Sequence, residues 1–486
     1  MIFFILACTG NKDTGSITDG DSAVEVVEAE SFDLSLDVMM SHLEELQEIA
    51  TDNSNNRSVG SSGGLLTRTY IVEELESLGY EVTTQPVPIT YFRENRDAML
   101  SVDDQEFTAS TFVYSGSGLV TAAVEGVDLQ LPPGASANSS TSGCDELDFE
   151  DFTAGNIALI QRGTCNFSVK ASNAQNAGAA GVIIFNEGQS GRTGVVEGML
   201  DETGSTIPVV GVSFTSGEFL SSFQGQVTVD VDAELTTLET ENIFAEIPAP
   251  ELDSVVLVGA HLDSVVAGPG INDNGSGSSM LLAMAAWFVE NPMEKDRNIR
   301  FAWWSAEEIG LIGSQYYVDN ATDLNEIEYY LNFDMVASPN YVPFIYDGNG
   351  DQFGLQGPSG SAKIEETFEA HFTERVLPFT GTPFDGRSDY GPFVEVGIAS
   401  GGLFTGAESI KSESESTMYG GISGVAYDAC YHQACDTIEN INAEALQVMG
   451  NAALNVTINL SNGNRIRPAS QHSLIQFEYQ GEWLKR

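Results

Sequence analysis

The sequence predicts an α/β fold, with a mixed, mostly parallel sheet flanked by helices on both faces and a smaller β-rich insertion. Two observations support this prediction. After Asn242, apolar runs alternate with helical segments, which is the pattern of βαβ units. Residues 97–236 instead show short strands, turns rich in Gly, Ser and Pro, and one obvious helix. The chain has 486 residues, which is enough for two or more domains.

The first part of the main domain, residues 35–96, is predicted to contain two helices and a strand. Apolar residues recur at helical spacing over 36–50. A second helix is expected over 65–78, because Gly79 is placed to cap its carboxyl end. Residues 80–87 then have the composition of a strand.

The second part of the main domain, residues 237–462, is predicted to supply the parallel strands. Residues 255–260 form a continuous apolar run, as expected for a strand buried on both faces. In such sheets, functional side chains collect at the carboxyl ends of the strands. After this first strand the predicted order is helix, strand, helix and strand, at residues 278–288, 299–304, 311–318 and 329–333.

The composition excludes several classes of protein. The chain has 19 Lys and Arg against 71 Asp and Glu, a net charge of −52, so its surface repels phosphate backbones and anionic lipid headgroups. We therefore expect no nucleic-acid partner. The apolar content of 42% is too high for a wholly disordered chain. No run of 18 apolar residues occurs, so no transmembrane helix is expected.

The N-terminus favours export. Residues 1–8 end in Ile-Leu-Ala before Cys8, which resembles a bacterial lipobox, although the stretch is short and lacks a basic region. An ordinary apolar start is the alternative. Residues 9–34 have the composition of an acidic flexible tether, and residues 463–486 form a basic tail. We expect an extracellular or cell-envelope location, and any membrane tether would be through a lipidated Cys8.

The remaining four cysteines form two couples that are close in sequence: Cys144 with Cys165, and Cys430 with Cys435. An even set of this kind is typical of disulfides in an oxidising compartment. A thiolate zinc site is the alternative, but neither couple has the CxxC spacing.

Histidines and acids follow the predicted strands, where a functional site is expected. Each motif alone has a structural explanation, such as acids in the first turn of a helix. Together they match zinc chemistry, and two sets sharing one carboxylate match a two-metal site. The motifs are His261-Leu262-Asp263, a Gly-rich loop around Asp273, the pair Glu307-Glu308, Asp334, and His432 between two cysteines.

In their order and spelling, these motifs resemble the co-catalytic di-zinc aminopeptidases, the family-28 metallopeptidases. The resemblance covers about residues 35–96 and 240–460 and implies a zinc-exopeptidase-like fold. It also implies peptide substrates with a free N-terminus and two Zn²⁺ per chain. His261 and Asp334 would bind one zinc, Glu308 and His432 the other, and Asp273 would bridge the two.

The same resemblance implies roles for residues around the metals. Glu307 would be the general base that deprotonates a zinc-bridging water and returns the proton to the leaving amine. Asp263 would orient His261. Tyr431 resembles a tyrosine that hydrogen-bonds the tetrahedral intermediate. Arg387 lies in a segment that resembles the wall of the pocket for the substrate amino terminus, although Tyr390 stands where close relatives often carry His.

The insertion, residues 97–236, resembles a protease-associated domain. The resemblance rests on residues 155–163, 165–167, 181–186 and 207–212, which have the pattern of buried strands around a helix with small residues. Because no acid–base or metal motif occurs there, a lid or spacer beside the active site is favoured over independent binding.

Other functions remain open from the sequence. A glutaminyl cyclase resembles this fold and shares most of the ligands but uses one zinc, and another zinc exopeptidase of the same fold is also an alternative. A carboxypeptidase of related fold usually carries a separate dimerisation domain, which is not found. A non-catalytic peptide-binding lipoprotein would be expected to lose Glu307 or a ligand, and none is lost.

Overall fold

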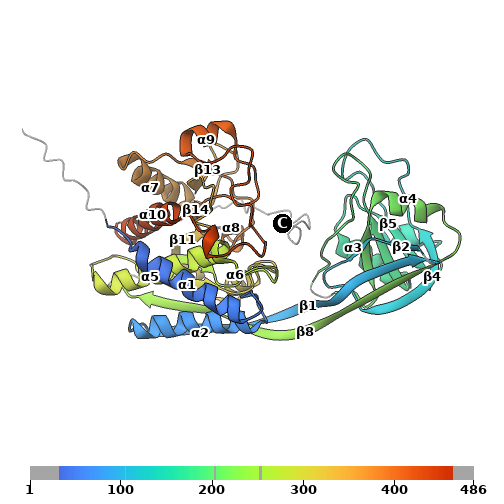
Figure 1. Cartoon of the computed structure of the whole chain (residues 1–486), viewed down its shortest axis with the longest axis horizontal. Coiled ribbons are helices and arrows are strands. Elements are labelled where there is room, and N and C mark those ends of the chain that lie inside the picture. Colours follow the sequence, from blue (N-terminus) through green and yellow to red (C-terminus); the bar gives the residue numbers. More distant parts are fainter. Residues whose placement is uncertain (1–31, 104, 202–203, 251–253, 464–486) are drawn as a thin grey trace, which may run out of the picture. The chain divides into compact units, whose positions relative to one another are not determined.

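The computed structural model describes residues 32–103, 105–201, 204–250 and 254–463 (Figure 1). Cys8, nearly all of the predicted tether and the basic tail after Gly463 lie outside the described residues. Within the described ranges, no helix is both long and apolar enough to cross a membrane.

Two helices precede the first strand. The side chain of Ser35 caps α1 (Leu36–Asp52). The hydroxyl of Ser61 accepts the N–H of Gly64 at 3.0 Å, so α2 (Ser62–Ser77) begins three residues before the predicted start. Gly79 follows α2 with φ +90°, as expected for a residue that ends a helix.

The main domain contains a mixed sheet, as predicted. Its strand order is β13-β12-β14-β11-β9-β10-β8, followed by β1. Strand β9 is parallel to both β10 and β11, and β11 is parallel to β14. The strands that introduce mixed pairing are β8, antiparallel to β10, and β12, antiparallel to β14. The strands are β9 (Val255–His261), β10 (Asn298–Trp304), β11 (Ile327–Phe333), β12 (Phe344–Tyr346), β13 (Thr380–Thr382) and β14 (Ser400–Phe404).

Helices cover both faces of this sheet, which is why its central strands β9 and β11 are buried along nearly their whole length (Figure 1). On one face α1 packs against α5, and α10 packs against α7 and β9. On the other face α6 and α8 enclose an aromatic cluster that includes Trp304, Tyr330 and Phe393. The helices are α5 (Gly277–Glu290), α6 (Ile312–Asn320), α7 (Ser361–Glu374), α8 (Tyr390–Glu395), α9 (Glu413–Tyr419) and α10 (Ala443–Ser461).

Two unusually long strands carry the insertion. Strand β1 (Val82–Val102) pairs antiparallel with β8 (Gln226–Ile247) from Val82 to Val102. The sequence predicts only a short strand here, because the partner of β1 lies more than a hundred residues away. The register shifts twice between Glu94 and Met99, close to the point where the sequence changes character.

The insertion has its own strands and core. Parallel strands β5, β6 and β7 are buried, and a disulfide joins Cys144 to Cys165. Its elements are β2 (Gln105–Phe107), β3 (Ala109–Thr111), β4 (Gly118–Gly126), β5 (Ile157–Gln161), α3 (Phe167–Asn176), β6 (Gly181–Phe185), β7 (Val209–Val212) and α4 (Phe214–Ser222).

His42 makes the stability of the main domain depend on pH. It is buried on α1 with Nδ1 2.5 Å from the hydroxyl of Tyr70 on α2, and burial lowers the pKa of His42 to about 4. The unfolded chain therefore binds a proton at a higher pH than the folded chain. The contribution of neutral His42 to the free energy of unfolding is complete above about pH 6.5. As the pH falls toward 4, the free energy of unfolding decreases by up to about 3 kcal/mol.

We expect His42→Gln to flatten the pH dependence of the unfolding free energy between pH 6.5 and 4. Urea unfolding followed by tryptophan fluorescence measures this, because Trp303 and Trp304 lie on β10 of the same domain. His371 also has a pKa lowered to about 4, mainly by burial, so part of the slope should remain. An unchanged slope in His42→Gln would contradict the assignment.

Candidate metal centre

The metal-ligand candidates converge at the carboxyl edge of the three central strands. His261 ends β9, Glu307 and Glu308 follow β10, and Asp334 follows β11. These strands are parallel neighbours, so their carboxyl ends meet. Asp273 lies in the turn that precedes α5.

The side chains form two groups that share one carboxylate. His261 Nε2 lies 3.3 Å from Oδ1 of Asp273 and 3.3 Å from Oδ1 of Asp334. His432 Nε2 lies 3.2 Å from Oδ2 of Asp273 and 3.0 Å from Oε2 of Glu308. The two oxygens of Asp273 thus face different histidines, so each group offers one His and two carboxylates to a cation.

The charge of the cluster fits cations. Burial and the charge of Asp273 raise the pKa of Glu308 to about 7. Against the effect of burial, Glu308 and Asp273 raise the pKa of His432 to about 10. Without cations the cluster would have to gain protons, and Glu308 Oε1 is buried without a hydrogen-bond partner among the described residues. Imidazole and carboxylate donors in this number suit zinc.

Glu307 lies beside the ligands without joining either group. Its Oε2 is 3.9 Å from His261 Nε2, and its side chain is buried. Burial raises the pKa of Glu307 well above its usual value; the attraction of His261 opposes this, and Asp334 and Asp389 add to it. A carboxylate with an elevated pKa next to a metal centre is suited to hold and release a proton.

Asp263 contacts His261 mainly through its backbone. Its backbone carbonyl lies 3.2 Å from His261 Nδ1, whereas its carboxylate is 3.8 Å away. The carboxylate instead accepts the backbone N–H of Glu307 at 3.2 Å through Oδ1. Asp263 therefore connects the end of β9 to the turn that carries Glu307.

Tyr431 and Arg387 lie together beside the centre. Arg387 Nη2 is 3.3 Å from the hydroxyl of Tyr431, whose ring stacks on His432 at a centroid distance of 3.8 Å. Glu408 contacts both terminal nitrogens of Arg387, at 3.2 and 3.4 Å. A disulfide joins Cys430 to Cys435 across this loop.

Tyr390 orders the turn that carries Arg387. Its hydroxyl accepts the N–H groups of Asp385 and Gly386 at 3.1 and 2.9 Å and donates to Oδ1 of Asp385 at 2.7 Å. Asp385 in turn accepts the N–H of Arg387 at 3.1 Å. The tyrosine at this position thus has a definite structural role.

Sequence reasoning missed several residues that hold the ligands. Asp436 accepts the backbone N–H groups of Asn272 and Asp273 at 2.9 and 3.0 Å, and Ser388 donates to Oδ2 of Asp334 at 2.7 Å. Asp436 directly follows Cys435 and Ser388 directly follows Arg387, so their closeness in sequence to candidate site residues was a usable signal.

Arg57 is the missed residue with the largest set of contacts. It is fully buried, and each of its three nitrogens donates to a different backbone carbonyl. Nε donates to Pro269 at 2.8 Å, Nη1 donates to Leu262, and Nη2 donates to Gly270. These carbonyls belong to the turn that joins His261 to Asp273. Burial lowers the pKa of Arg57 to about 10, against the effect of nearby acids including Asp263, so the group stays cationic at neutral pH.

A buried cluster of histidines and carboxylates at the carboxyl edge of an α/β sheet defines the class as a metal-dependent hydrolase. The sequence profile of peptidase family M28 matches residues 242–457, and that of the PA domain matches residues 127–220. The chain belongs to peptidase family M28 and is an aminopeptidase with an inserted protease-associated domain. The resemblance drawn from the motifs is confirmed.

Relatives and solved structures support this assignment. An aminopeptidase of Pseudomonas aeruginosa strain UCBPP-PA14 is 46% identical over 445 residues, which cover 88% of this chain and 81% of the relative. A probable leucine aminopeptidase 2 of Aspergillus oryzae is 41% identical over 428 residues, covering 86% and 83%. A solved zinc aminopeptidase from Bacillus subtilis has a TM-score of 0.65 and 26% identity, covering 89% of this chain and 97% of that one.

We expect Arg57→Lys to weaken metal retention and to lower activity by about 10- to 100-fold, because a single ammonium nitrogen cannot occupy the positions of three guanidinium nitrogens that each bond a different carbonyl. Metal content after dialysis against increasing chelator, measured together with kcat, checks this. Arg93→Lys is the matched control, since Arg93 is exposed and pairs with Glu234. Equal metal retention in the Arg57 and Arg93 variants would show that Arg57 does not position the turn.

Proposed function

We propose that this aminopeptidase binds two zinc ions per chain and removes the N-terminal residue of peptides with Glu307 as general base. The observation that carries the proposal is the division of Asp273 between two ligand groups, one with His261 and one with His432. Asp334 would complete the first group and Glu308 the second.

The chemistry divides between the ions and the protein. Zinc ions in these groups would polarise the scissile carbonyl and lower the pKa of a water shared between them. Glu307 takes a proton from the attacking water at its carboxylate and delivers it to the leaving amine. Burial raises the pKa of Glu307, which supports this role. Bound cations would lower that pKa again, because positive charge favours the ionised carboxylate.

Tyr431 would act on the substrate, and Arg387 would position Tyr431. The hydroxyl of Tyr431 would donate to the carbonyl oxygen as negative charge develops. Arg387 holds that hydroxyl at 3.3 Å and is itself held by Glu408, which preorganises the donor. The net charge of −52 is consistent with cationic peptide N-termini as substrates. The names of the fungal relatives favour leucine as the residue released.

We also propose that the protein is exported. Two disulfides, Cys144–Cys165 and Cys430–Cys435, support this, since disulfides persist in oxidising compartments. A lipid anchor on Cys8 remains a sequence-based proposal.

The test of the function uses protein loaded with two zinc equivalents. We expect hydrolysis of Leu-Gly-Gly with release of leucine and no cleavage of N-acetyl-Leu-Gly-Gly, because acetylation removes the α-amine. Cleavage of both peptides would show that the amine is not recognised. Cleavage of neither, together with pyroglutamate formation from a Gln-peptide and one zinc per chain, would favour a glutaminyl cyclase.

The adjacent glutamates allow a matched comparison of roles. We expect Glu307→Gln to retain two zinc ions while kcat falls by about 10²- to 10⁴-fold, because only proton transfer is lost. Glu308→Gln should instead bind less zinc, because a ligand is lost. Metal analysis and kinetics of the two variants check this. Loss of zinc in Glu307→Gln would make that residue a ligand and overturn the assignment of the base.

A further inference from the structure

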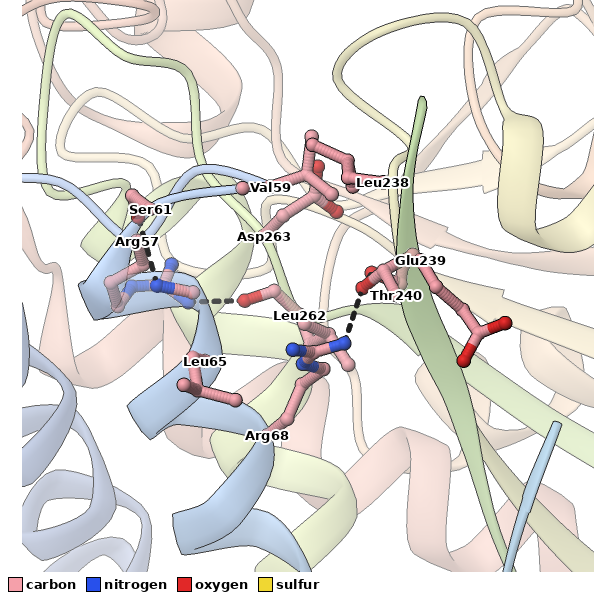
Figure 2. A pocket seen from close by; sticks show the side chains of 13 residues that line it. Arg57, Val59, Ser61, Leu65, Arg68, Leu238, Glu239, Thr240, Leu262 and Asp263 are labelled. Atoms are coloured by element: carbon pink, nitrogen blue, oxygen red, sulfur yellow. Dashed lines mark hydrogen bonds between the residues drawn. The ribbon is translucent and has the colours of Figure 1, made fainter. Parts of the chain in front are cut away.

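A cavity of about 240 Å³ lies between the start of α2, strand β8 and the turn after β9 (Figure 2). It is distinct from the metal groups, because none of the five candidate ligands lines it. Its volume is below the 300–1,000 Å³ typical of drug-sized ligands, so it suits a smaller molecule.

One wall of the cavity carries a positive charge that is incompletely bonded. Arg68 reaches from α2 to the hydroxyl of Thr240 on β8 at 2.8 Å, as Figure 2 shows. Among the described residues, this hydrogen bond uses one of the five N–H donors of the Arg68 guanidinium. Thr240 is fixed in turn by the hydroxyl of Ser305 at 2.6 Å. Arg68 therefore has donors left for an anionic group.

Another wall carries an unpartnered acceptor. Asp263 lines the cavity, and its side chain is 1% exposed. Oδ1 accepts the N–H of Glu307, but Oδ2 is buried with no hydrogen-bond partner among the described residues. A buried carboxylate oxygen without a partner is costly, so a donor in the cavity would stabilise it.

The remaining walls are apolar, already satisfied or exposed to solvent, the last being the carboxylate of Glu239. Val59, Leu65 and Leu238 line the cavity with aliphatic groups. The guanidinium of Arg57 also borders it, but each of its three nitrogens already donates to a backbone carbonyl. The ligand must therefore satisfy Arg68 and Asp263 and present an aliphatic part to the rest.

We propose that this cavity binds a free α-amino acid with an aliphatic side chain, its carboxylate on Arg68 and its ammonium on Oδ2 of Asp263. The carboxylate of Asp263 would repel a simple anion, and the guanidinium groups of Arg57 and Arg68 would repel a simple cation. A small zwitterion is favourable to both walls. Amino acids of this class are what an aminopeptidase releases.

A ligand in the cavity would affect residues of the metal centre through Asp263. Asp263 accepts the N–H of Glu307 at 3.2 Å, and its carbonyl lies 3.2 Å from Nδ1 of His261. A ligand that pulls on Asp263 therefore acts on a metal-ligand candidate and on the proposed base through direct contacts. The released amino acid would inhibit the enzyme from this second site as well as by competing with substrate.

Equilibrium dialysis of the zinc-loaded full chain with radiolabelled L-leucine tests the proposal. We expect two leucines per wild-type chain, one at the active site and one in the cavity, and one per chain in Arg68→Gln. Arg93→Gln, which removes an exposed arginine of β1, should retain two. One leucine per wild-type chain, or two in Arg68→Gln, would overturn the proposal.

The wild-type enzyme provides a second readout that does not depend on a variant folding. N-acetyl-leucine lacks the ammonium and leucinamide lacks the carboxylate, so neither should displace the second leucine. Leucine should inhibit wild type with a mixed pattern against peptide and Arg68→Gln with a competitive pattern. Purely competitive inhibition of wild type would show that the cavity has no effect on catalysis, and displacement by both analogues would exclude recognition of the zwitterion.

Discussion

The structure depends on the burial of acidic side chains at one edge of the main sheet. Asp263, Asp273 and Asp389 are at most 5% exposed, and Glu307 and the side chain of Glu308 are similarly buried. Such a concentration of carboxylates is stable only with compensating positive charge or protons. Two histidines and Arg57 supply part of that charge, and the geometry of Asp273 leaves the rest to cations.

The backbone around these acids is held in conformations that L-residues seldom adopt. Ala306, Met335 and His432 have φ values of 63°, 51° and 56°, and each is a ligand candidate or lies within two residues of one. Hydrogen bonds stabilise these turns: the N–H of Ile312 donates to the carbonyl of Ala306 at 3.0 Å, and the N–H of Thr405 donates to that of Met335 at 3.0 Å. The neighbouring elements therefore determine where the ligands point.

The sequence was sufficient for the parts of the site that follow local rules. Apolar runs predict β9 and β10, and acids or histidines directly after such runs lie at one sheet edge whatever the details of packing. Arg57 could not be found in this way, because it bonds carbonyls more than two hundred residues away and carbonyls leave no mark on the sequence. For the same reason, the backbone contact of Asp263 with His261 was not predictable.

The length of β1 and β8 also escaped prediction, and it explains how the chain accommodates its insertion. Because β1 and β8 pair with each other from Val82 to Val102, the chain leaves and re-enters the main domain on adjacent strands. The main sheet then continues from β8 to β10 without a gap. The ligand-bearing strands and their turns thus lie on the far side of β8 from β1, so the insertion changes none of the pairings that bring the carboxylates together.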